Sequence, residues 1–276
     1  MNPPVVPYTP ILRRYHEVCS LDEQSRLHLA RTLNEKPELL AADFVNSIDA
    51  LDTGYKSCAA FRPRPKWPRH PEQLGIVANG PDLAWYMHRQ HTLDVDAEPS
   101  LAVEWVDYEV SVLRTLGAAV FDEQVYGMAE GEPARAGNAL KVDLLLVNAD
   151  PADRTPVLGE VKVKRDKEPF SALVQLLVYI AHLSTHSQYA RLRTNFASAR
   201  YPDIDRGRFD GYLLLYKFGQ SPNKYLGALL AESELLSERL MQLPQITAHI
   251  RRLVSLDVSL DKNDMLAATK RWLHPA

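Results

Sequence analysis

The chain has 276 residues, of which 46% are hydrophobic and 24% are charged, as is usual for a globular protein with a sizeable core. Its formal net charge of −3 argues against a protein that coats nucleic acid through bulk positive charge, although it is compatible with a local basic cleft. Two cysteines without a CxxC motif exclude a four-cysteine zinc or iron–sulfur cluster. The start of the chain lacks a signal-peptide pattern and its apolar runs are short, so we expect a cytoplasmic protein without a membrane partner.

Residues 1–95 are expected to form an N-terminal helical region with a proline-rich arm. A capping box, Ser20 to Glu23, precedes the first clear amphipathic run, and PELLAADFVNSIDAL predicts a second helix. The prolines of FRPRPKWPRHPEQLG break helix and sheet alike, which indicates an extended linker. A short helix is predicted over 81–91.

Residues 96–276 are expected to form the main domain. The pattern predicts a helix over 100–116 and then strands over 118–127, 139–148 and 155–164. A helix over 171–186, a strand over 209–218 and a short strand over 224–231 follow. Three further helices are predicted over 233–243, 244–254 and 261–273. This order of elements indicates an α/β fold.

Two of these strands, 139–148 and 155–164, flank the run NADPADRTP, which is rich in turn-forming residues. We expect them to form an antiparallel hairpin that is symmetric about the middle of this run. In that register Asp143 lies directly opposite Glu160.

The alternation of a strand places the charged side chains of this hairpin on one face and its apolar side chains on the other. The charged face is predicted to hold Lys141, Asp143, Glu160 and Lys162. The apolar face is predicted to hold Val142, Leu144, Val161 and Val163. Two carboxylates opposed on neighbouring strands repel each other, so their pairing is expected to enclose a cation.

The carboxylates of Asp143 and Glu160, with the backbone carbonyl of Val161, would form a partial oxygen shell suited to Mg²⁺ or Mn²⁺. Lys162 would orient or activate a water molecule and stabilise charge on a phosphate group. The alternative is an ordinary solvated strand face, because any charged strand edge can carry Glu-x-Lys.

An Asp followed on the next strand by Glu-x-Lys resembles the motif of the PD-(D/E)XK, or restriction-endonuclease-like, nuclease superfamily. Here the matching residues are Asp143 and the run from Glu160 to Lys162. The run QLLVY, from Gln175 to Tyr179, is similar to the Gln-xxx-Tyr motif of the branch typified by the RecB nuclease domain.

The resemblance covers roughly residues 98–218 and implies a restriction-endonuclease-like αβββαβ core with a mixed central sheet and additional C-terminal helices. It implies catalytic roles for Asp143, Glu160, Lys162, Gln175 and Tyr179. Gln175 would position the metal site or the substrate, and Tyr179 would support it. The family also places a carboxylate on the helix before the first strand. Glu109 is the expected residue and a further metal ligand, and Glu104 is the second choice.

Two histidines, His182 and His186, lie four residues apart on the predicted helix, which is a spacing that zinc ligands can use. No third ligand accompanies them. We therefore expect both to be surface histidines.

Three basic stretches could contact nucleic acid: 62–70, 162–167 and 191–208. The last also contains Phe196 and Tyr201, whose rings could stack on bases. For each stretch, a solvated loop is an equal alternative.

The leading hypothesis is a nuclease dependent on Mg²⁺ or Mn²⁺ that hydrolyses phosphodiester bonds, in DNA rather than RNA. The chain has no Walker loop. It is therefore expected to act alone, as a homodimer, or with a partner subunit that supplies a motor or recognition function in restriction, repair or phage defence. The alternatives are a nuclease acting on RNA and a non-catalytic nucleic-acid-binding or assembly protein.

Overall fold

The computed structural model describes residues 9–54, 68–112, 141–163, 169–217 and 225–271. Its strands form one mixed sheet of eight strands in the order β1-β3-β4-β5-β6-β7-β8-β2. The larger strands are β3 (Val103–Ser111), β4 (Lys141–Asn148), β5 (Pro156–Val163), β6 (Phe209–Tyr216), β7 (Ile250–Leu260) and β8 (Leu266–Lys270). Two short strands, β1 (Thr92–Leu93) and β2 (Val95–Asp96), complete its edges. An α/β fold with a mixed sheet is therefore confirmed.

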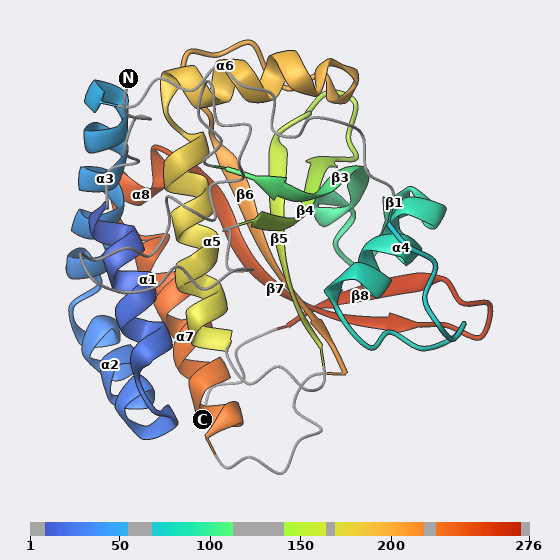
Figure 1. Cartoon of the computed structure of the whole chain (residues 1–276), viewed down its shortest axis with the longest axis horizontal. Helices are drawn as coiled ribbons and strands as arrows, with labels where there is room; N and C mark the ends of the chain where they lie inside the picture. The colour runs from blue at the N-terminus through green and yellow to red at the C-terminus, as the bar shows by residue number, and fades with distance from the viewer. Residues whose placement is uncertain (1–8, 55–67, 113–140, 164–168, 218–224, 272–276) are drawn as a thin grey trace, which may run out of the picture.

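Strands β3, β4 and β5 form an antiparallel meander, and β6 then lies parallel to β5. The connection from β5 to β6 runs through α5 (Pro169–Leu183) and α6 (His186–Asn195), with a short 3₁₀ helix, η3 (Ala197–Ala199), after them. Helix α7 (Leu226–Leu240) and the short α8 (Pro244–Thr247) connect β6 to the parallel strand β7. Strand β8 then returns antiparallel to β7 in a hairpin that extends away from α1, α2, α3, α5 and α7 and lies beside α4 (Figure 1).

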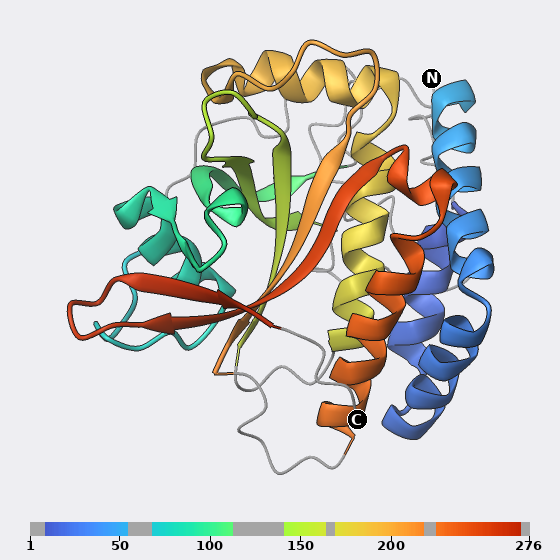
Figure 2. The same ribbon diagram turned by 180° about the vertical axis from the view of Figure 1, so that it is seen from behind.

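Helices cover both faces of the sheet. On one face lie α1 (Pro10–Ser20), α2 (Glu23–Glu35), α3 (Pro37–Gly54), α5 and α7, as both views show (Figures 1 and 2). Helix α4 (Gly80–Gln90) lies on the other face, and η1 (Pro99–Leu101) precedes β3. In the part of the chain that is described, no helix has the length and apolar character needed to span a membrane.

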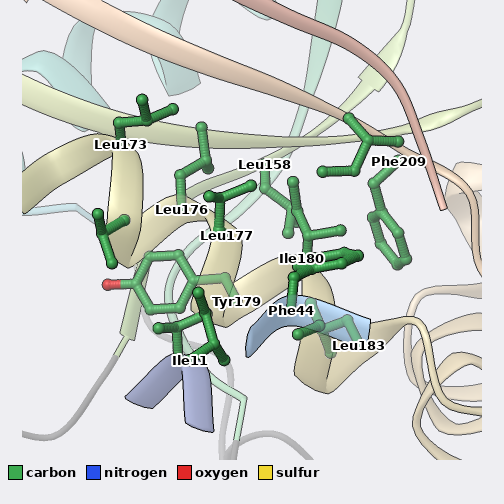
Figure 3. Packing of buried hydrophobic residues seen from close by; sticks show 14 of the residues in the cluster. Ile11, Phe44, Leu158, Leu173, Leu176, Leu177, Tyr179, Ile180, Leu183 and Phe209 are labelled. Carbon is green, nitrogen blue, oxygen red and sulfur yellow. The ribbon is translucent and has the colours of Figure 1, made fainter. Parts of the chain in front are cut away.

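Helix α5 is buried on nearly every side, because it lies between the sheet and the outer helices. Such a helix must be apolar all round, as FSALVQLLVYIAHL is. Figure 3 shows its leucines packed with Leu158 of β5, Phe44 of α3 and Ile11 of α1. The N-terminal helices therefore belong to the same hydrophobic cluster as the sheet, and the predicted boundary at 95/96 does not separate two cores.

Several predicted elements are confirmed: the N-terminal helices, α4, the β4–β5 hairpin, α5 and β6. The first turn of α2 is capped by Asp22, whose side chain accepts a hydrogen bond from the Ser25 N–H, and not by the predicted Ser20. The predicted strand 118–127 lies outside the described residues.

Other predicted elements are wrong. The helix predicted over 100–116 is strand β3, which pairs along β4 and thereby satisfies the backbone groups of that buried strand. The strand predicted over 224–231 is the start of α7, whose leucines recur on one helical face. Helices are predicted over 244–254 and 261–273, but in the described part of these ranges only the single turn of α8 is helical, and most of the remainder forms β7 and β8. These two strands extend the sheet beyond β6.

Candidate active site at the open end of the β4–β5 hairpin

The β4–β5 hairpin has the predicted register. Leu144 pairs with Gly159, so the next position along brings Asp143 level with Glu160. The regular ladder ends at this point. Beyond it, the Val161 N–H donates to Asp143 Oδ2 at 2.9 Å, and the Asp143 carboxylate takes the place of a backbone acceptor. The acidic side chain is thus held between the two strands where they begin to diverge.

Glu160 and Lys162 lie on the face of β5 that α5 covers, since Val161 and Val163 pack on the opposite face, beneath α4. Glu160 is only 1% exposed, and its Oε1 forms an ion pair with Lys162 Nζ at 2.8 Å. Lys162 is itself largely buried. The alternative of an ordinary solvated strand face is therefore excluded. A carboxylate and an ammonium group in this setting are costly to desolvate and require each other.

The alternation predicted for the hairpin holds with one exception. Leu144, Val161 and Val163 pack in the cluster beneath α4, as predicted, whereas Val142 packs in the cluster around α5. Its pairing partner Val110 lies in that same cluster. In β3, Glu109 lies between Tyr108 and Val110, which belong to different clusters, and its positive φ of 46° interrupts the alternation of that strand.

The Gln175–Tyr179 pair reaches the same place from α5. The Tyr179 hydroxyl donates to the backbone carbonyl of Lys141 at 2.6 Å, and Gln175 Nε2 donates to the Tyr179 hydroxyl. Burial raises the pKa of Tyr179 well above its ordinary value, and the negative charges of Glu160 and Asp143 raise it further. Tyr179 is therefore a protonated hydrogen-bonding group, and it anchors β4 two residues before Asp143.

A tyrosine that the sequence did not single out completes this cluster. Tyr15, on α1, donates to Gln175 Oε1 at 3.2 Å. Burial is the main cause that raises the pKa of Tyr15, followed by Cys19 and then by the charges of Glu160 and Asp143. The sequence signal was limited to the helical spacing of Ile11, Tyr15 and Val18, which marks a core-facing side of α1 without saying what it covers.

The predicted third carboxylate does not join the other two. Glu109 lies on strand β3 rather than on a helix, and within the described residues no three Asp, Glu, His or Cys side chains come close enough to hold a metal ion. Glu104 is also on β3, where it forms an ion pair with Arg154 at 2.8 Å. The expectation failed because segment 103–111 is a strand, so its side chains follow a different periodicity from that of a helix.

The two remaining carboxylates still suit a small divalent cation. Mg²⁺ is commonly held by one or two carboxylates, with water and substrate phosphate filling its other positions. Asp143 and Glu160 could each supply an oxygen. The N–H and C=O of one strand residue point to the same side, so the Val161 carbonyl lies on the β4 side together with the N–H that contacts Asp143. The two carboxylates and this carbonyl are the oxygen ligands predicted from the sequence, without Glu109.

The histidines and aromatic residues considered from the sequence for contacts with a metal or a nucleic acid are buried or half-buried, except for His186. His182 is 1% exposed and therefore not a surface histidine; its Nδ1 lies 2.7 Å from the Val178 carbonyl. His186 is exposed, as predicted. Tyr201 is buried, so its ring cannot stack on a base, and Phe196 is half-buried against the core.

Of the basic stretches, residues 62–67 and 164–168 lie outside the described part of the chain. In 191–208, Arg193 pairs with Asp203 and Arg206 pairs with Asp52 at 3.0 Å. Arg191 is buried. Arg193 and Arg206 are thus paired with carboxylates, whereas Arg200 and Arg208 are exposed, so the described part of this stretch keeps some exposed positive charge.

A cavity of about 630 Å³ lies elsewhere, between α7, η1 and the first half of β7. It is lined by four basic side chains, of which Arg251 binds Asp210 at 2.5 and 2.8 Å and Arg271 binds Glu234 and Asp257. Lys270 lies 3.7 Å from Glu98, and Arg252 donates to the Ser100 carbonyl. Because three of the four basic groups are paired with carboxylates, the cavity lacks the character of a phosphate site. The chemistry of the hairpin makes the stronger candidate.

No family model, curated protein or solved structure matches this chain.

Proposed function

We propose that the protein is a metal-dependent nuclease that hydrolyses phosphodiester bonds, with DNA as the favoured substrate. The observation that carries the proposal is the convergence of Asp143, Glu160 and Lys162 where β4 and β5 diverge. From the next helix, Gln175 and Tyr179 form a hydrogen-bonded pair that ends on the Lys141 carbonyl, two residues before Asp143. An acidic pair with an adjacent lysine suits metal-assisted hydrolysis of a phosphate diester, because it can hold a cation and stabilise negative charge on the phosphate.

The arrangement of elements supports the same proposal. The meander β3–β4–β5, the crossover through α5 and the parallel strand β6 place the acidic hairpin beneath α5. We propose that this unit is a restriction-endonuclease-like core. The first strand of that core would be β3, and the helix that precedes it in the family would have its counterpart among the N-terminal helices.

Each residue of the site has a role that follows from its contacts. Asp143 and Glu160, with the Val161 carbonyl, would hold Mg²⁺ or Mn²⁺, which when bound supplies positive charge for polarising water and phosphate. Lys162, fixed by Glu160, presents an ammonium group that stabilises the negative charge growing on the phosphate oxygens. Tyr179 holds the start of β4 in place and, because its pKa is raised, does not act as the nucleophile at neutral pH.

Cleavage assays with matched variants test the proposal. Purified protein is incubated with single-stranded DNA, duplex DNA and RNA in the presence of Mg²⁺, Mn²⁺ or EDTA. Asp143→Asn and Lys162→Met are compared with Lys262→Met, which removes an exposed lysine from the β7–β8 turn. We expect cleavage that EDTA, Asp143→Asn and Lys162→Met each abolish and that Lys262→Met leaves intact.

Cleavage that survives EDTA or either site variant would refute the proposed mechanism. Cleavage of RNA alone would reassign the substrate. Binding of nucleic acid without cleavage under any of these conditions would favour a non-catalytic binding or assembly protein with this fold.

A further inference from the structure

Helix α1 contributes a side chain to the candidate site. It packs along α5 within the main hydrophobic cluster, where Ile11 and Tyr179 lie close together (Figure 3). The Ile11 N–H is tied to the side chain of Ser47 on α3, which fixes the start of α1. Tyr15 lies one turn further along the same side of α1, and its hydroxyl meets Gln175. The packing of α1 against α5 on one side and α3 on the other thus fixes the position of the Tyr15 hydroxyl.

The hydrogen-bonding capacity of these groups determines the direction of every bond. A backbone carbonyl can only accept, so the Tyr179 proton goes to the Lys141 carbonyl and the Tyr179 oxygen must accept from Gln175. The amide nitrogen of Gln175 therefore faces Tyr179, and its oxygen faces Tyr15. Tyr15 must then be the donor in the remaining bond.

These bonds form a single directed chain from α1 to the start of β4. Its members are the Tyr15 hydroxyl, the Gln175 amide, the Tyr179 hydroxyl and the Lys141 carbonyl. Lys141 lies two residues before Asp143 on the same strand, so the chain ends at the backbone that carries a proposed metal ligand. Groups of this kind, which act through the ligands they orient, commonly affect metal affinity or activity strongly.

We propose that Tyr15 is a positioning residue of the site, which holds the Gln175 amide and, through Tyr179, the backbone beside Asp143. The inference rests on the proposed nuclease function and extends it, because it makes the N-terminal helix an essential part of the active centre. It predicts that the region before residue 95 cannot be removed without loss of activity.

Tyr15→Phe removes one hydroxyl and leaves the ring in place. The matched control is Tyr189→Phe on α6, since the Tyr189 hydroxyl likewise donates one hydrogen bond, to the Pro202 carbonyl at 2.9 Å, away from the site. Unfolding in urea establishes that both variants fold. The side-chain amide signals of Gln175, assigned in ¹H–¹⁵N spectra by their disappearance in Gln175→Leu, report directly on the orientation of that amide.

We expect the Gln175 signals to move in Tyr15→Phe and to stay in place in Tyr189→Phe. We expect kcat for Mn²⁺-dependent cleavage to fall about 10- to 100-fold in Tyr15→Phe, with KM little changed. Because Tyr15 acts through Gln175, adding Tyr15→Phe to Gln175→Leu should cause no further loss.

A Tyr15→Phe variant that matches Tyr189→Phe in kcat and in the Gln175 signals would overturn the inference. If Tyr15→Phe lowers kcat by the same factor in the Gln175→Leu background as in the wild-type protein, the inference is also overturned. If the wild-type protein cleaves no substrate, the proposed function fails, and the amide signals then decide alone: movement supports the positioning role and constancy refutes it.

Discussion

Replacing Lys162 with Met tests whether Lys162 and Glu160 form a buried ion pair in which each charge depends on the other. The Lys162 side chain is 16% exposed and the Glu160 side chain 2% exposed, and they are joined by a contact of 2.8 Å. Removing one partner of a buried ion pair leaves the other charge desolvated and uncompensated, at a cost of about 3 to 5 kcal/mol. Since Lys162 retains some solvent contact, we expect about 3 kcal/mol at pH 7. In a chain of this size, that loss lowers Tm by roughly 6 to 12 °C.

The assay is urea unfolding at pH 7 in EDTA, followed by circular dichroism. Lys262→Met serves as the control, because it removes an exposed lysine. The double variant Glu160→Gln/Lys162→Met removes both charges and should recover most of the lost stability. A loss below about 1 kcal/mol for Lys162→Met, as expected for an exposed pair, would refute the buried-pair reasoning.

The same variant also tests the cation site without an activity measurement. A divalent cation between Asp143 and Glu160 supplies the positive charge that Lys162→Met removes. Mn²⁺ should therefore stabilise Lys162→Met more than it stabilises the wild-type protein, and it should have little effect on Asp143→Asn. Equal shifts in all three proteins would count against a metal site at this position.

Three further changes have effects that the structure predicts. Burial lowers the pKa of His182 to about 4, so between about pH 6.5 and 4 the unfolded chain binds a proton that the folded protein does not. The free energy of unfolding should therefore decrease by about 3 kcal/mol as the pH is lowered through this range. His182→Gln should remove this dependence in urea titrations at pH 7 and 4.5. Arg251→Met should cost about 3 to 5 kcal/mol in chemical unfolding, because it leaves the fully buried Asp210 without its cation. Gly159→Ala should cost about 1 to 3 kcal/mol in thermal or chemical unfolding, because its new methyl group would lie 3.1 Å from Leu144 Cβ and 2.9 Å from a Leu214 methyl group.

Each of these predictions has its own control. An unchanged pH profile in His182→Gln would show that this histidine does not govern acid stability. Adding Asp210→Asn to Arg251→Met should restore much of the stability, and failure to do so would assign the loss to packing. Gly227 faces open space on α7, so Gly227→Ala should not destabilise the protein, and a similar loss there would contradict the steric argument for Gly159.

The sequence allowed much of the site to be predicted. A symmetric run of turn-forming residues specified the register of the hairpin and hence the meeting of Asp143 with β5, because a tight connection leaves few ways to pair two strands. Alternation placed Glu160 and Lys162 on one face, and helical spacing placed Gln175 beside Tyr179. These are local relations, set by periodicities of two residues in a strand and about 3.6 in a helix.

Other features were decided only by tertiary structure. Segment 103–111 could have formed a helix, but it became a strand because β4 needed a hydrogen-bonding partner along its edge. That choice removed Glu109 from its predicted role, and the sheet likewise drew the C-terminal segments into β7 and β8.

Burial was decided in the same way. Whether Glu160 and Lys162 face water or the interior depends on the packing of α5 on β5 and of α1 on α5. The alternation of charge and valine along the strand does not contain that information. Tyr15 lies 160 residues from Gln175 along the chain. Their contact exists because two apolar helix faces pack together, and hydrophobic packing, unlike strand or helix periodicity, acts between segments at any separation.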